Sequence, residues 1–228
     1  MFSASWRAVA GRARRAAQEA RQAGECSSPQ HVAVGVKRFA GTAAAGNAES
    51  LYEGEFVDGK MHGYGVYRWA AGHRYEGQWL GGRRHGYGVL ISPGGDVYEG
   101  EWDTDQRHGQ GASKQFHGDM YVGNWANSKY EGEGRLELVD AGVYDGMFEA
   151  GKMCGVGLYQ YPKGGLYMGD FLDDKKHGAG VYWYTSGSVY EGSWEKNEKH
   201  GKGKMWYPNG RIVVGEWKNG NEASIEEM

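Results

Sequence analysis

The chain has 228 residues, 39% of them hydrophobic, and its 41 glycines far exceed the usual share of about 7%. A thick aliphatic core is therefore excluded, and the 16 Tyr, 9 Trp and 6 Phe supply much of the apolar material. Two cysteines, Cys26 and Cys154, are too few for a disulfide framework or a cysteine-rich zinc site, and no stretch reaches the roughly 20 apolar residues of a membrane-spanning helix.

Residues 1–49 form a leader whose composition differs from that of the rest of the chain. It is rich in Ala and Arg and carries seven basic and three acidic side chains, whereas residues 50–228 carry 19 basic and 26 acidic ones. Apolar residues at helical spacing predict a basic amphipathic helix over residues 2–22. Three interpretations stay open: a presequence for an organelle, a helix that docks on a partner or an anionic membrane, and a poorly ordered leader.

A sequence repeat begins directly after the leader. YEGEFVDGKMHGYGV at 52–66 is followed by YEGQWLGGRRHGYGV at 75–89, and the same start returns every 23 residues up to Val213. Gly follows two residues after each start, Trp or Phe follows after two more, and a Gly-x-Gly pair comes later. The aromatic residues of these starts, which we predict to be structural, are Tyr52, Phe56, Tyr75, Trp79, Tyr98, Trp102, Tyr121, Trp125, Tyr144, Phe148, Tyr167, Phe171, Tyr190, Trp194 and Trp217.

The spacing inside one repeat predicts a β-hairpin. Aromatic residues and Gly alternate with polar residues at period two, and a second stretch rich in Tyr, Val and Trp follows a turn. Because a single hairpin is marginally stable, the hairpins must stack. We expect an all-β fold: a single-layer, elongated, twisted antiparallel sheet of fifteen strands over residues 50–220, made of seven complete repeats and a half repeat.

Two details of this sheet also follow from the sequence. The Gly-x-Gly pairs are expected to leave room for the aromatic rings of an adjacent strand. The half repeat that starts at Val213 is expected to stop after one strand, as a terminal cap, and to be followed by an acidic tail at 221–228.

The stretches YEGEW at 98–102 and RHGQG at 107–111, with their copies, resemble MORN repeats, the membrane occupation and recognition nexus family. The resemblance covers residues 52–220 and implies a non-catalytic scaffold, since MORN arrays occur in ciliary, junctional and cortical assemblies. The dense copies of HG are most similar to those of radial-spoke proteins. The expected location is therefore the cytoplasm, in the cytoskeleton of an axoneme or in the cell cortex, with a mitochondrion or plastid as the alternative set by the leader.

No residue pattern points to catalysis, a cofactor or a metal. His62, His85, His108, His177 and His200 precede Gly pairs, but equivalent positions of stacked hairpins lie about 9 to 10 Å apart, too far to share a zinc ion. We expect these imidazoles to anchor turns. The recurring carboxylates Glu53, Glu76, Glu99 and Glu191 are expected to be solvated. Neither a phosphate-binding loop nor a nucleophile elbow occurs, and we predict that the protein is not an enzyme.

Two sets of side chains are predicted to bind partners. Exposed rings are expected to receive a peptide or helix of another protein subunit, with end-to-end self-association as the alternative; these are Tyr67, Trp69, Tyr182, Tyr184 and Tyr207. Cations at hairpin turns are candidates to contact an anionic membrane, although acidic residues in the same turns oppose this; these are Arg83, Arg84, Lys175 and Lys176. The acidic body excludes nonspecific nucleic-acid binding. A protein-interaction scaffold is the main hypothesis, and a phospholipid-binding tether is the alternative.

Overall fold

The computed structural model describes residues 32–39 and 49–227, and the chain divides into two compact units, residues 1–129 and 130–228. The first unit contains β1 (Ala33–Phe39), β2 (Ser50–Val57), β3 (Lys60–Arg68), β4 (Arg74–Leu80), β5 (Arg83–Ile91), β6 (Val97–Asp103), β7 (Gln106–Lys114) and β8 (Met120–Ala126). The second contains β9 (Lys129–Leu138), β10 (Gly142–Glu149), β11 (Lys152–Gln160), β12 (Leu166–Leu172), β13 (Lys175–Trp183), β14 (Val189–Glu195), β15 (Glu198–Trp206), β16 (Ile212–Lys218) and β17 (Asn221–Glu227).

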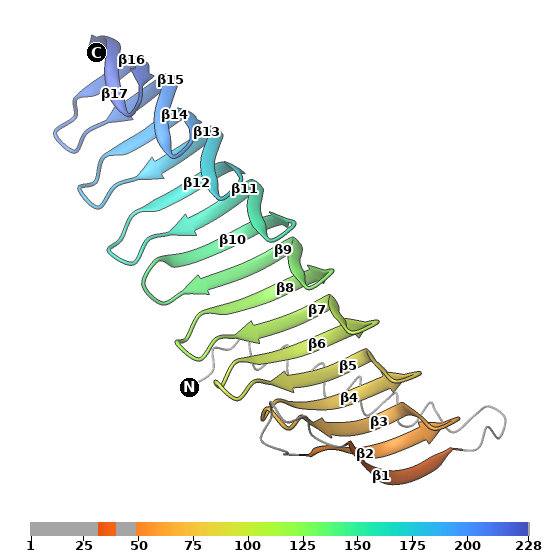
Figure 1. The fold of residues 1–228 in the computed structure, drawn as a ribbon. Coiled ribbons are helices and arrows are strands. Elements are labelled where there is room, and N and C mark those ends of the chain that lie inside the picture. Colours follow the sequence, from red (N-terminus) through yellow and green to blue (C-terminus); the bar gives the residue numbers. More distant parts are fainter. Residues whose placement is uncertain (1–31, 40–48, 228) are drawn as a thin grey trace. The chain divides into compact units, whose positions relative to one another are not determined.

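Every regular element of the described residues is a strand, so the predicted all-β class is confirmed. Within each unit, strands that follow one another in the chain pair antiparallel and form a single layer (Figure 1). Strands β2 to β16 are the fifteen that the repeat predicts. None of the described residues belongs to a helix that could cross a membrane. The helix predicted over residues 2–22 lies outside the described residues.

Two strands extend the sheets beyond the boundaries predicted from the repeat. β1 lies inside the predicted leader and pairs with β2, with Ala33 opposite Phe56. β17 lies inside the predicted acidic tail and pairs with β16, so the half repeat is completed into a hairpin and the expectation of a one-strand cap is wrong. Neither strand carries the Tyr and Trp of the repeat. Both can form because an edge strand offers N–H and C=O groups that need partners.

A band of glycines crosses each sheet and leaves room for tyrosine rings. In the β4–β5 hairpin Gly77 lies opposite Gly88, and a Cβ atom on Gly88 would overlap the ring of Tyr75. The predicted use of the Gly-x-Gly pair is therefore confirmed for its second glycine. It is wrong for the first, because Gly86 has a φ of +58°, a left-handed conformation that glycine adopts without steric cost.

Rings of successive hairpins form the core. The ring of Tyr75 packs edge-on against Trp79 of its own strand, with centroids 5.0 Å apart, and against Trp102 of the next hairpin, at 5.4 Å. The Tyr75 hydroxyl donates to the backbone oxygen of Gln78 at 3.0 Å, and Trp102 Nε1 donates to the backbone oxygen of Gly88 at 3.2 Å. Because the same contacts recur along the array, each hairpin completes the core of its neighbour.

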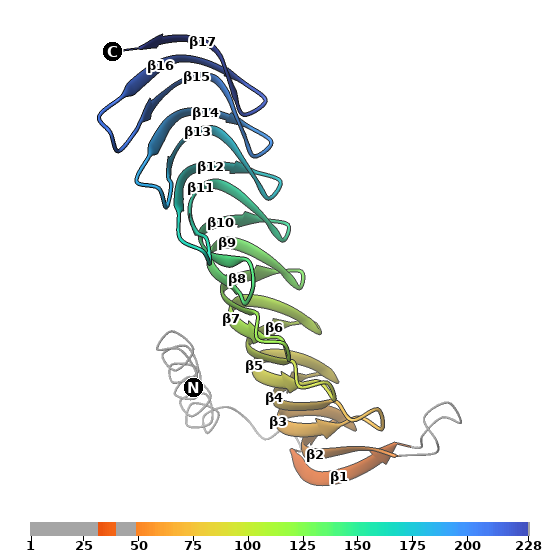
Figure 2. The ribbon, with the colours of Figure 1, turned by 90° about the vertical axis from the view of Figure 1, so that its left-hand side faces the viewer.

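Tight turns join the two strands of each hairpin and also touch the preceding hairpin. Lys196 and Asn197, in the turn between β14 and β15, have φ values of 50° and 77°, as a type I′ turn requires. The backbone N–H of Asn197 donates to the backbone oxygen of Lys176 at 3.0 Å. Such bonds bring together residues of adjacent hairpins that are 21 positions apart. In this unit the strands bend along their length (Figure 2).

Candidate functional site

Each sheet has a ring face, defined as the side that carries Tyr75 or Tyr167 and their equivalents, and further aromatic residues lie on it above the core. In the second unit, ring centroids are 4.6 Å apart for Tyr159 and Tyr161, 5.6 Å for Tyr161 and Tyr182, and 4.4 Å for Tyr182 and Tyr184. All four side chains are half-buried. They form a continuous aromatic surface with one side toward solvent.

The structure places the five aromatic residues predicted to bind a partner on the ring faces, where all five are half-buried and not exposed as expected. In the first unit, Tyr67 and Trp69 have ring centroids 4.5 Å apart. In the second, Tyr182 and Tyr184 pack together, and the Tyr207 hydroxyl donates to Glu222 Oε1 at 3.1 Å. Two further members of this surface, Tyr159 and Tyr161, were not predicted from the sequence. They precede Tyr182 and Tyr184 by one repeat of 23 residues, so the period alone could have found them.

The four cations predicted to contact an anionic surface lie on two sides of the sheets. Arg83 and Lys175 are exposed at their turns, whereas Arg84 and Lys176 are half-buried on the ring face. The reason is that neighbouring residues of a strand point to opposite faces. Arg84 lies over the ring of Trp102, with its guanidinium carbon 4.2 Å from the centroid. These cations therefore do not form one row along an edge.

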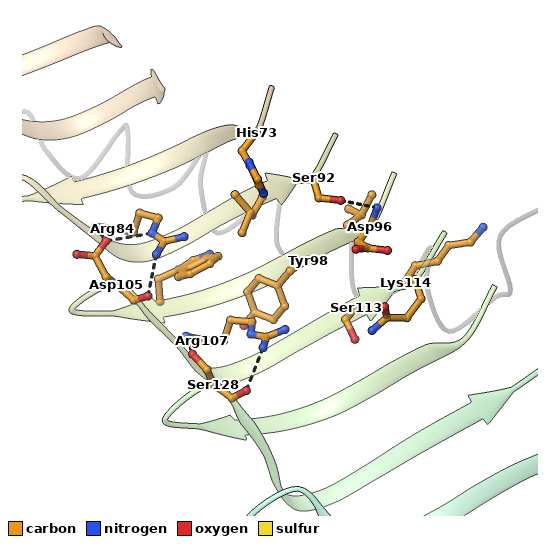
Figure 3. A pocket seen from close by; sticks show the side chains of 14 residues that line it. His73, Arg84, Ser92, Asp96, Tyr98, Asp105, Arg107, Ser113, Lys114 and Ser128 are labelled. Carbon is orange, nitrogen blue, oxygen red and sulfur yellow. Dashed lines mark hydrogen bonds and ion pairs between the residues drawn. The ribbon is translucent and has the colours of Figure 1, made fainter. Parts of the chain in front are cut away.

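A cavity of about 350 Å³ lies on the ring face of the first unit, and two cations that line it, Arg84 and Arg107, form hydrogen bonds with the next hairpin (Figure 3). Arg84 Nε donates to Asp105 Oδ1 at 3.0 Å, and Arg84 Nη2 donates to the backbone oxygen of Asp105 at 2.9 Å. Arg107 Nη2 donates to the backbone oxygen of Ser128 at 3.1 Å. The charge of Arg84 is thus balanced inside the protein.

A cavity of about 310 Å³ lies on the ring face of the second unit, and its cations stand among aromatic rings. Lys176 Nζ is 4.5 Å from the ring centroid of Trp194 and 4.8 Å from that of Tyr182. Burial lowers the pKa of Lys176 to about 8 and also lowers that of Lys199. Burial raises the pKa of Tyr161, so its hydroxyl stays protonated. This cavity presents positive charge and hydroxyl groups between apolar ring surfaces.

The histidines and carboxylates of the repeat do not converge on either cavity. His85 Nδ1 lies 3.3 Å from Asp103 Oδ1, beside the turn of its hairpin. The expectation that the recurring carboxylates are solvated is wrong for Glu99, which is only 6% exposed because it lies between Val89 and Ala112 of the neighbouring strands. Within the described ranges, no three His, Cys, Asp or Glu residues are grouped so that they could hold a metal ion.

Comparison with known proteins identifies a matching family model and several solved structures with distant similarity. The family model of the MORN repeat matches residues 52–74, 75–97, 98–112, 121–142, 144–166, 167–189 and 190–210. No match was found among curated protein sequences.

Among solved structures, the TCP10 domain of Danio rerio CPAP is 13% identical, with a TM-score of 0.43, over 87% of this chain and 99% of that one. The same domain in complex with a peptide of Danio rerio STIL is 11% identical, with a TM-score of 0.32, over 85% of this chain and 99% of that one. The Drosophila melanogaster SAS-4 TCP domain, in complex with a proline-rich motif of Ana2, is 12% identical, with a TM-score of 0.27, over 72% of this chain and 83% of that one. At TM-scores below 0.5, these likenesses carry no functional argument.

Proposed function

Since the chain belongs to the MORN-repeat family, a non-enzymatic repeat scaffold, we propose that it is a scaffold subunit that binds segments of partner proteins on its ring face. The observation that carries the proposal is the aromatic surface of Tyr159, Tyr161, Tyr182 and Tyr184 beside a cavity of about 310 Å³. Half-buried tyrosines in such a place supply large contact areas at a low entropic cost.

The ring face supports this proposal because its outer rings are only half-buried. Tyr167 and Tyr190 pack on the band of glycines and are fully buried, whereas Tyr182 and Tyr184 are half-buried and keep one side toward solvent. Tyrosine and tryptophan are enriched where protein interfaces concentrate their binding energy. A peptide or a helix of a partner would cover these rings without any change in the sheet.

We propose an axonemal or cortical assembly as the setting, which follows the resemblance to radial-spoke proteins and the array architecture. A phospholipid-binding tether is less well supported, because acidic side chains lie beside the turn cations. Lys152 Nζ is 2.7 Å from Asp173 Oδ1, for example, and such pairs weaken the field that an anionic membrane would meet. The organelle alternative depends on the leader, most of which lies outside the described residues.

The test compares variants of the full-length chain in partner capture from extracts of ciliated cells, with cross-linking before isolation. Tyr182→Ala with Tyr184→Ala should abolish capture of specific proteins while the circular dichroism of the sheet is kept. Trp183→Ala is the matched control, because Trp183 lies between them on the opposite face of β13 and is 36% exposed. Unchanged capture by the double variant would contradict the proposal, and joint loss of capture and circular dichroism would assign the two rings to the core.

A further inference from the structure

A cation on the ring face meets the turn residue that lies 21 positions later in the chain, and the type of that residue determines whether the cation has a counter-charge. In the first unit, Arg84 meets Asp105, whose carboxylate accepts hydrogen bonds from both the side chain and the backbone N–H of Arg84. In the second unit, the corresponding residue for Lys176 is Asn197, and for Lys199 it is Gly220. A neutral amide and a glycine thus occupy the place that a carboxylate occupies for Arg84; for Arg107 of the first unit this place is held by Ser128.

With Asn197 in the position that corresponds to Asp105, Lys176 has no acidic partner among the described residues. Asn197 Oδ1 accepts a hydrogen bond from the backbone N–H of Lys176 at 2.8 Å, so the amide serves the backbone and not the ammonium group. In the part of the chain that the structure describes, Lys176 Nζ makes neither an ion pair nor a hydrogen bond, and its neighbours are rings. A desolvated charge without a partner is costly, which is why burial lowers the pKa of this residue.

Hydrogen-bond donors without acceptors surround the same cavity. Across the described ranges, the hydroxyls of Tyr161, Tyr182 and Tyr184 have no hydrogen-bond partner, and all three residues line the cavity with Lys176. The nearby carboxylates are Glu198, which lines the cavity, and Glu222, which lies beside Lys199 and accepts a bond from Tyr207. The cavity therefore offers several donors and positive charge to a ligand that brings acceptors.

We propose that the cavity beside Lys176 is a docking site for an acidic segment of a partner protein, with an Asp or Glu carboxylate seated between Lys176 and the tyrosine hydroxyls. The inference rests on the proposed function and specifies the chemistry of the segment. Apolar residues that flank the carboxylate would pack on the rings of Tyr161, Tyr182 and Tyr184. The site would exclude basic segments, because Lys176 and Lys199 repel them.

Charge and shape favour a peptide carboxylate over other anions. The body of the chain carries 26 acidic and 19 basic residues after position 49, so a polyanion such as nucleic acid is repelled by most of its surface. A single carboxylate needs only the local positive charge. A small inorganic anion would leave the aromatic surface beside the cavity uncovered. The side chains next to a peptide carboxylate would cover that surface.

The test selects ligands from an unbiased library of phage-displayed random peptides against the full-length chain, held by its N-terminus. Recovered peptides should be enriched in Asp and Glu with apolar neighbours. A synthetic copy of such a peptide should bind Lys176→Met about tenfold or more weakly than the parent chain. Lys175→Met is the matched control, because it removes the same charge from the adjacent, exposed position and should bind like the parent.

The outcomes separate this inference from the proposed function. Ring-face binders that lack acidic residues, or that bind Lys176→Met and the parent equally, would overturn the acidic-segment inference and leave the scaffold function standing. Failure to recover any peptide whose binding depends on Tyr182 and Tyr184 would overturn both. If vesicles of phosphatidylserine and phosphatidylcholine bind in a Lys176-dependent way and no acidic peptide does, the site takes a lipid headgroup and the inference is wrong.

Discussion

The side-chain amide of Asn197 holds the backbone of Lys176 through a hydrogen bond of 2.8 Å and leaves the ammonium group of Lys176 among aromatic rings. In the first unit, Asp105 makes the same backbone bond to Arg84 and also balances its charge. At the same place in the hairpin turn, an Asp neutralises the cation of Arg84, whereas an Asn leaves the cation of Lys176 without a counter-charge.

The first prediction concerns the stability cost of Lys176. Because burial lowers its pKa to about 8 from an ordinary value of 10.5, the unfolded chain binds this proton more tightly than the folded chain does. The charged residue therefore opposes folding below pH 8, and Lys176→Met should raise the free energy of unfolding by about 1 kcal/mol at neutral pH. Denaturant unfolding at several pH values measures it.

The stability gained by Lys176→Met should depend on pH, and this dependence controls for effects other than the charge. As the pH rises from about 8 to 10.5, the parent chain gains the stability that the charge had removed, so the advantage of Lys176→Met should shrink. Lys175→Met, at an exposed position, should show no such trend. A Lys176→Met variant that is less stable than the parent at neutral pH would show that contact with the rings outweighs the cost of burial.

The second prediction tests the hydrogen bonds of Asp105. Asp105→Ala removes the bonds to the backbone and to the side chain of Arg84, and it places Ala at a φ of 68°, which Asp tolerates better; together these should cost about 1 to 3 kcal/mol in the free energy of unfolding. Asp105→Asn reproduces the residue found at Asn197 and should keep the backbone bond, so its cost should be about 0.5 kcal/mol. Equal costs for the two variants would mean that neither the backbone bond nor the tolerance of Asp and Asn for this φ contributes to stability.

The third prediction tests the band of glycines. Gly88→Ala places a Cβ atom into the ring of Tyr75 and should lower the free energy of unfolding by about 1 to 3 kcal/mol, as expected for overpacking. Gly94→Ala is the matched control, because the nearest atom to its Cβ is Ser92 Oγ at 3.7 Å and the residue is exposed. Thermal unfolding of the two variants measures the difference, and an equal loss would show that the ring can move aside.

The fourth prediction concerns alkaline pH. Burial raises the pKa values of Tyr52 and Tyr190 to about 12 from an ordinary value of 10, and that of Tyr75 further still. The folded chain therefore holds these protons more tightly, and stability is intact below pH 10 and falls as the pH rises from 10 to about 12.

Tyrosinate absorbance and circular dichroism recorded on one sample check this alkaline transition. The core tyrosines should ionise together with the loss of the sheet, whereas in concentrated urea they should ionise near the ordinary value of 10. Ionisation of all tyrosines near pH 10 with the sheet intact would contradict the buried positions of Tyr52 and Tyr190.

The sequence by itself determined the hairpins, because the information is local and repeats. The period of 23 residues and the alternation inside it predict the fifteen strands β2 to β16 and the buried positions of Tyr75 and Trp102. Side-chain direction in a strand follows from period two, and the polar residues and glycines between the two halves of each repeat place the turns. The same period implied Tyr159 and Tyr161 once Tyr182 and Tyr184 were chosen.

Only the tertiary structure decided which side chains of different hairpins meet. Strands β1 and β17 lack the repeat pattern, and they form because neighbouring edges offer hydrogen bonds, which composition does not reveal. The contact between Lys176 and Asn197 depends on the pairing register and on the bond from each turn to the hairpin before it. The charge balance on the ring face depends on these contacts across hairpins. The periodic sequence therefore specified the aromatic surface, but it did not reveal that Lys176 lacks a counter-charge.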